Sequence, residues 1–181
     1  MMRVVSIVGM PGAGKSEVAK IFEKNGYVKV RFGDITDQEI ERRGLELSEE
    51  SERDIREQLR KEHGMSAYAE LNLPRIELAL QSSDVVVDGL YSWEEYKLLK
   101  EYYGDNLFVV AVWASPETRY QRLTKRLYRP LTLEEAASRD ITEIENTGKG
   151  GPIAMADFTI INESSLENLE KETKRVIFAL R

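Results

Sequence analysis

The chain has 181 residues, a formal net charge of −6 at pH 7 and no cysteine. Disulfides, thiolate zinc sites and thiol catalysis are therefore excluded, and the negative charge disfavours nucleic acid and anionic membranes as partners. Hydrophobic residues make up 41% and charged residues 32% of the sequence, which is typical of a soluble globular protein. No apolar run approaches the roughly 18 residues of a membrane span and no signal peptide precedes the first strand, so we expect a cytoplasmic protein.

Residues 9–16 fit the phosphate-binding pattern G-x-x-x-x-G-K-[ST] at every fixed position. A short apolar run, Val4 to Val8, precedes the pattern, and residues 17–24 carry apolar side chains at helical spacing. This strand–loop–helix context supports the motif, because its glycines let backbone N–H groups curl around phosphate oxygens. Lys15 can then reach the outer phosphates, and the Ser16 hydroxyl is placed to bind Mg²⁺. The predicted nucleotide-binding residues are Gly9, Met10, Pro11, Gly12, Ala13, Gly14, Lys15, Ser16 and Glu17.

Four further apolar runs have the length and composition of buried strands, and helical segments separate them. These runs lie at residues 27–31, 84–89, 107–113 and 157–161. The alternation predicts an α/β protein, a P-loop NTPase three-layer fold with a five-stranded parallel sheet. We expect a single domain over residues 1–181. Its core is formed by residues 1–36, 83–125 and 155–181.

Two aspartates follow predicted strands. Because ligands bind beyond the carboxyl ends of strands in open α/β sheets, Asp34 is expected to face the phosphate loop. An aspartate of a turn or helix N-cap is the alternative at this position. Asp88 ends the third strand, so we expect it to contribute to Mg²⁺ binding with Ser16, directly or through water. Its alternative is a simple capping role.

Two segments are longer than a connection between parallel strands requires. Residues 37–82 are almost entirely helical in pattern, and we interpret them as an insertion that covers the site. A second helical insertion covers residues 131–144, inside a small lid at about residues 126–150. The glycine-rich stretch at residues 147–152 is expected to be a mobile connection, either a loop touching the base or a plain linker.

The helix that begins at Ser115 and Pro116 carries several cations. Spacing places Arg119, Arg122 and Arg126 on one helical face. Such a face after the fourth strand of a P-loop protein favours a clamp on transferring phosphates, although arginines near a helix C-terminus are ordinary.

In their order along the chain, these residues resemble the nucleoside-monophosphate kinase superfamily, in particular its adenylate-kinase-related and dephospho-CoA-kinase-like branch. Residues 33–34 are similar to the family's acceptor-site Gly-Asp, and residues 86–89 to its third-strand Asp-Gly. Residues 122–126 resemble the R-L-x-x-R that enters its lid, residues 139–140 the lid's second Arg-Asp, and residues 156–166 the dephospho-CoA kinase ending.

The resemblance implies an ATP-dependent phosphotransferase that uses Mg²⁺ and acts on a nucleotide-like acceptor of the AMP or dephospho-CoA type. It implies a helical acceptor-binding insertion at residues 37–82. Arg122 is also expected to bind ATP. The residues implied in catalysis are Lys15, Asp34, Arg122, Arg126 and Arg139.

The chain departs from adenylate kinases at both acceptor-phosphate arginines. Asp37 stands where those enzymes place an arginine three residues after the aspartate of Gly-Asp, and residues 90–92 are Leu-Tyr-Ser instead of apolar-Pro-Arg. AMP as the acceptor would need Arg31, Arg42 or Arg75 as a substitute. A dephospho-CoA-type acceptor would need a base, for which Asp34 is the candidate.

A competing hypothesis is a sensor or regulator that binds ATP and AMP without efficient transfer. A GTPase switch is disfavoured because no N-K-x-D motif is present, and a DNA-handling ATPase because the chain is acidic and its third strand ends in Asp-Gly. The oligomeric state is not predicted by the sequence.

Overall fold

The computed structural model describes residues 2–127 and 130–180, which form a parallel sheet of five strands in the order β2-β3-β1-β4-β5. The strands are β1 (Val4–Val8), β2 (Val28–Arg31), β3 (Val85–Asp88), β4 (Leu107–Trp113) and β5 (Phe158–Ile161). The α/β fold and the five-stranded parallel sheet predicted from the sequence are therefore confirmed.

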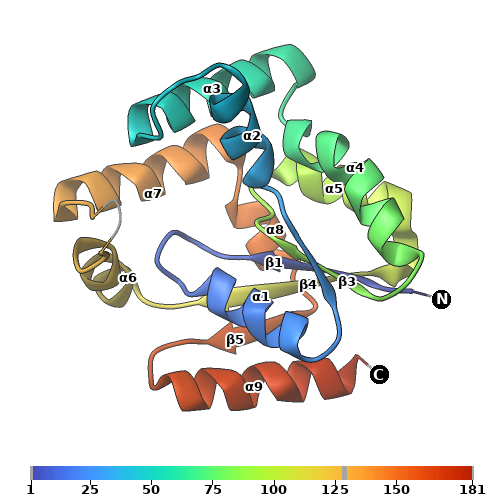
Figure 1. Cartoon of the computed structure of the whole chain (residues 1–181). Helices are drawn as coiled ribbons and strands as arrows, with labels where there is room; N and C mark the ends of the chain where they lie inside the picture. Colours follow the sequence, from blue (N-terminus) through green and yellow to red (C-terminus); the bar gives the residue numbers. More distant parts are fainter. Residues whose placement is uncertain (1, 128–129, 181) are drawn as a thin grey trace.

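Helices cover both faces of the sheet, as Figure 1 shows. One face is covered by α1 (Lys15–Lys24) and α9 (Leu166–Ala179), and the other by α4 (Ala67–Leu80), α5 (Trp93–Tyr103) and α8 (Gly150–Ala154). The remaining helices are α2 (Asp34–Arg42), α3 (Glu49–His63), α6 (Pro116–Thr124) and α7 (Leu133–Thr147), with a 3₁₀ turn, η1, at Gly104–Asn106. None of the described helices is long and apolar enough to cross a membrane.

Alternation along the buried strands divides the core into two layers. In β3, Val85 and Val87 pack toward α4 and α5, whereas Val86 packs toward α1 and α9. Successive side chains of a strand point to opposite faces, so a strand covered on both faces must be apolar throughout. The two clusters together hold the sheet rigid beneath its carboxyl edge.

The register of the sheet brings the carboxyl ends of its strands together. Asp88 is paired with Ile7, two residues before the glycine-rich loop that follows β1. At the ends of β4 and β5, the backbone N–H of Asn162 donates to the Trp113 carbonyl oxygen at 2.7 Å. Strand order reverses around β1, the position where parallel α/β sheets bind ligands.

The expectation of a mobile connection at residues 147–152 is wrong. Helix α7 continues through Thr147, and α8 begins at Gly150. Gly148 closes α7 in the left-handed conformation, with φ 60°, and a Cβ on Gly151 would lie 2.6 Å from a Trp93 ring carbon. The glycines serve helix termination and close packing, which composition alone does not distinguish from a flexible loop.

Candidate active site

The loop between β1 and α1 depends on glycine at several of its fixed positions. Gly9 and Gly14 have φ of 154° and 102°. A Cβ on Gly9 would lie 2.3 Å from the Val112 carbonyl oxygen, and one on Gly14 would lie 2.3 Å from Asn162 Nδ2. Both backbone conformation and space therefore exclude larger residues. The predicted nucleotide-binding residues 9–17 are contiguous in this loop and in the first turn of α1.

The Lys15 side chain folds back onto the glycine-rich loop. Its ammonium group donates to the carbonyl oxygens of Gly9, at 2.8 Å, and Met10, at 3.1 Å. Burial, followed by the charge of Lys149, lowers the pKa of Lys15 to about 7. Glu143 and Asp88 act in the opposite direction. The Lys15 amine is thus held against two carbonyl groups of the loop, and a bound anion would favour its charged form.

Ser16 and Asp88 meet at the mouth of the loop. The Ser16 hydroxyl oxygen lies 3.5 Å from an Asp88 carboxylate oxygen, and Asp88 is buried. Two oxygens at this separation fit neighbouring positions around Mg²⁺, which usually retains water and takes few protein ligands. Within residues 2–127 and 130–180, no three His, Cys, Asp or Glu side chains gather into a metal cluster. An ion here would rely on this pair, phosphate oxygens and water.

Asn162 supports the loop from outside, a role that the sequence analysis missed. Its side-chain Nδ2 donates to the Ala13 carbonyl oxygen at 2.8 Å, and its backbone carbonyl oxygen accepts from Arg122 Nη2 at 2.8 Å. Arg122 Nη1 also lies 3.5 Å from the Gly12 carbonyl oxygen. Asn162 directly follows β5, so the strand-end argument that selected Asp34 and Asp88 applies to it as well.

Arg119 connects the loop to α7. Its guanidinium group forms a buried bidentate ion pair with Asp140, with N···O distances of 2.8 and 2.6 Å. It also donates to the Pro11 carbonyl oxygen at 3.2 Å. These contacts occupy its donors, so this arginine holds protein groups in place and the prediction that it belongs to a phosphate clamp is wrong.

The predicted common face of Arg119, Arg122 and Arg126 is also wrong. Helix α6 ends at Thr124, and Arg126 follows it in an exposed position. The helical spacing argument fails because α6 ends two residues before Arg126. Arg139 lies on α7, where its Nε is 3.3 Å from a Glu143 carboxylate oxygen. The cations of the predicted lid thus lie on α7 as well as in the region after α6.

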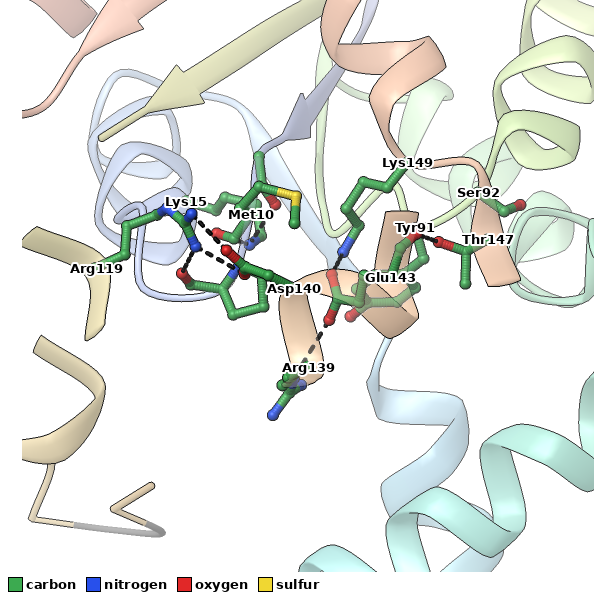
Figure 2. A network of polar contacts seen from close by, with 12 residues as sticks. Met10, Lys15, Tyr91, Ser92, Arg119, Arg139, Asp140, Glu143, Thr147 and Lys149 are labelled. Atoms are coloured by element: carbon green, nitrogen blue, oxygen red, sulfur yellow. Dashed lines mark hydrogen bonds and ion pairs between the residues drawn. The ribbon is translucent and has the colours of Figure 1, made fainter. Parts of the chain in front are cut away.

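Glu143 and Lys149 form a partly buried pair beside the loop, and the sequence analysis did not select either residue. The Lys149 ammonium group donates to the Glu143 carboxylate, and Figure 2 shows Glu143 between Lys149 and Arg139. Although burial raises the pKa of Glu143, the charges of Lys149, Lys15 and Arg139 together lower it to about 2. The one sequence signal was a lysine between glycines in residues 147–152.

Asp34 is the first residue of α2, and its side chain forms no cap bond to the helix. Its carboxylate instead accepts from Arg31 Nη1 at 3.0 Å and from Arg75 Nη2 at 2.7 Å. Arg31 also pairs with Asp37 at 2.5 Å. The structure therefore brings two arginines of the β2 end and the helical insertion together on Asp34, whereas Arg42 pairs with Glu39 on the exposed surface.

The sheet order and the glycine-rich loop between its central strand and α1 define a P-loop nucleotide kinase-like fold. Shikimate kinase from Bacteroides thetaiotaomicron matches with a TM-score of 0.63 and 16% identity, covering 99% of each chain. Dephospho-CoA kinase from Campylobacter jejuni matches with a TM-score of 0.57 and 16% identity, covering 99% of this chain and 97% of that one. At these identities the similarity shows the fold alone.

Sequence comparison places the chain more specifically. A family profile described as AAA domain matches residues 5–143. UPF0200 protein TK1334 of Thermococcus kodakarensis is 39% identical over 178 residues, covering 96% of both chains. UPF0200 protein PF1294 of Pyrococcus furiosus is 37% identical over 180 residues, covering 96% of this chain and 95% of the relative. The chain therefore belongs to the AAA domain family and, by its relatives, to the UPF0200 family.

Replacing Gly14 with alanine should damage the loop in two separable ways. The left-handed backbone alone costs about 1–3 kcal/mol for a residue other than glycine. The added Cβ must also displace Asn162. Gly26→Ala is the matched control, because Gly26 has a similar φ of 96° but nothing within 4 Å of an added Cβ. In chemical denaturation, Gly14→Ala should lose more unfolding free energy than Gly26→Ala. Equal losses would show that the close approach to Asn162 has no energetic role.

The lowered pKa of Lys15 predicts that phosphate binding takes up a proton. With a pKa of about 7, Lys15 is mostly neutral at pH 8 in the free protein. A bound phosphate favours the ammonium form, so binding at pH 8 should take up roughly 0.9 proton at this site and affinity should fall as pH rises above 7. Calorimetry of Mg·ATP binding in buffers of different ionisation enthalpy measures the uptake. Lys15→Arg stays charged and is the control; equal uptake by both proteins would contradict the prediction.

Proposed function

We propose that this protein is an ATP-dependent phosphotransferase that acts on a nucleotide-like small molecule, either a nucleoside monophosphate such as AMP or dephospho-CoA. The observation that carries the proposal is the convergence of Lys15, Ser16 and Asp88 at the mouth of the glycine-rich loop. Such a site provides cations and donors for a triphosphate but no covalent nucleophile. The kinase-like fold supports this reaction class.

On the donor side, the N–H groups of residues 9–16 and the Lys15 ammonium group would bind the β- and γ-phosphates. Ser16 and Asp88 would hold Mg²⁺, which when bound neutralises charge on the phosphate oxygens. Asn162 and Arg122 keep the loop in shape by holding the Ala13 and Gly12 carbonyl oxygens. These contacts orient the γ-phosphoryl group for in-line transfer.

In the transfer step, an acceptor oxygen forms a bond to the γ-phosphorus while the bond to the bridging oxygen breaks. The electron pair of the broken bond stays on ADP. A phosphate acceptor brings no proton that must be removed, whereas a hydroxyl acceptor must lose one to a base, for which Asp34 is the candidate. Arg122, Arg126 and Arg139 would neutralise the charge that spreads over the transferring group.

The acceptor would bind between the sheet and the helical insertion of residues 37–82. Arg31 and Arg75, both on Asp34, supply guanidinium groups at the carboxyl end of β2. They would replace the two acceptor-phosphate arginines that adenylate kinases have at other positions, because a phosphate dianion needs charge-assisted hydrogen-bond donors. A lid of about residues 126–150 would close over the site and exclude water as a competing acceptor.

A nucleotide-binding sensor is the alternative, and one observation favours it. Ser92 stands where adenylate kinases have an acceptor-phosphate arginine, and its hydroxyl is committed to the fold. It caps α5 by accepting from the Glu95 amide at 3.1 Å and donates to the Met65 carbonyl oxygen at 2.6 Å. If Arg31 and Arg75 do not bind an acceptor, the protein would bind ATP and AMP without efficient transfer.

The reaction class is tested by ADP production from Mg·ATP with AMP, CMP, UMP, GMP or dephospho-CoA. We expect one of these acceptors to stimulate ADP formation, and Lys15→Ala to lower the stimulated rate on the order of 10²-fold or more, because the charge on the outer phosphates is lost. Silence across the panel together with measurable ATP binding would favour the sensor. Full activity of Lys15→Ala would overturn the mechanism.

The role of Asp34 is tested by Asp34→Asn, which keeps the shape but removes the charge. Both carboxylate oxygens accept from arginines, so we expect a looser arginine pair, an acceptor KM raised about tenfold and a smaller change in kcat. A kcat lowered about 10²-fold with unchanged acceptor KM would instead assign Asp34 as the base. Glu39→Gln is the control, since Glu39 pairs with Arg42 and Arg43 on the surface of the same insertion.

A further inference from the structure

Lys149 is a buried cation in a position that the fold fixes closely. The residue is only 2% exposed and directly precedes α8. Gly148 before it ends α7, and Gly151 after it packs against the Trp93 ring, so the backbone on both sides is constrained. An ammonium group is removed from water at considerable cost unless it is paired. Such a placement requires a compensating anion nearby.

The anion that meets Lys149 is the carboxylate of Glu143, and other cations surround the same group. Lys149 binds one carboxylate oxygen, and Arg139 Nε lies 3.3 Å from the other. Lys15 is close enough for its charge to help lower the Glu143 pKa to about 2, against the effect of burial. One singly charged carboxylate therefore contacts two cations, and a third basic group, Lys15, lies close by. A phosphoryl group, with more charge and more acceptor oxygens, suits this environment better than a carboxylate does.

Lys149 also lies between the donor and acceptor sides of the proposed site. Its ammonium group is 5.3 Å from the ring centroid of Tyr91, a cation–π distance. Tyr91 follows β3 and forms edge contacts with Phe32, after β2, and with Tyr68, in the helical insertion. On the other side, Lys15 belongs to the ATP loop. A cation placed between these groups lies where a phosphoryl group would move from donor to acceptor.

We propose that Lys149 is a further catalytic residue, which binds the transferring phosphoryl group, and that Glu143 takes the place of that group in the nucleotide-free protein. This inference rests on the proposed phosphotransfer function. The incoming phosphate displaces the Glu143 carboxylate from Lys149 and Arg139. Glu143 thus keeps the cations paired and in position while the site is empty, and it competes with the nucleotide for them.

The test compares Glu143→Gln with Lys149→Met, because the proposal gives the two variants opposite effects. Calorimetry measures binding of Mg·ATP and of tripolyphosphate, which carries phosphates without a base. Glu143→Gln should bind both probes about tenfold more tightly, since the competing charge is gone. Lys149→Met should bind both about tenfold more weakly and lower the rate of acceptor-dependent ADP formation. Asp84→Asn is the control, because it breaks a partly buried ion pair with Arg3 at the opposite edge of the sheet and should leave affinity unchanged.

A purely structural pair would give a different pattern. Weaker binding by both variants, or unchanged binding by Glu143→Gln, would overturn the inference. The proposed function would still stand if the unmodified protein carries out phosphotransfer. If neither the unmodified protein nor Glu143→Gln binds Mg·ATP, the proposed function fails together with the inference. If Lys149→Met does not fold, Lys149→Arg serves in its place because it keeps the positive charge. It should retain its affinity for tripolyphosphate within a few-fold. A tenfold loss of affinity would contradict the proposal that the charge at this position binds the phosphoryl group.

Discussion

The geometry of the loop after β1 is the constraint on which the rest of the site depends. Its backbone passes so close to the Val112 carbonyl oxygen and to Asn162 that Gly9 and Gly14 have no room for a side chain. The loop shape is therefore set by β4 and by the end of β5, two elements remote in sequence. Because Lys15 and Ser16 directly follow the loop, their positions are fixed by the same contacts. The packed sheet thus positions the loop, and the loop in turn positions Lys15 and Ser16.

Helix α7 is tied to this loop by charge. Its Asp140 forms the buried pair with Arg119, which also binds the Pro11 carbonyl oxygen, and its Glu143 faces Lys149 and Lys15. Removing one partner of a buried pair costs about 3–5 kcal/mol, because the other charge is left uncompensated. Any anion that enters the loop changes the balance of these charges. Occupancy of the proposed phosphate site would therefore be coupled to the position of α7 through these charges.

Local patterns were enough to predict the strands, the glycine-rich loop and the meeting of Ser16 with Asp88. These features depend on short runs and on the rule that parallel strands end at one edge. The same rule would have selected Asn162. The partners of Arg119 and Lys149 were not predictable, because the carboxylates that they meet depend on how α7 packs beside α6 and the loop. Residues 147–152 failed for another reason: glycines that end a helix or pack on Trp93 have the same composition as a flexible linker.

On the proposed acceptor side, one chemical requirement would be met by other residues than in adenylate kinases. A phosphate-bearing acceptor needs guanidinium donors, and the chain lacks arginine at both positions that adenylate kinases use. Arg31 and Arg75 instead converge on Asp34, with Arg75 also held by Asn72 at 2.7 Å. Asp34 holds the two guanidinium groups in place, because each of its oxygens already accepts a charged donor. The catalytic role predicted for Asp34 stays a prediction, and under the proposed function this pairing favours a role in positioning the two arginines.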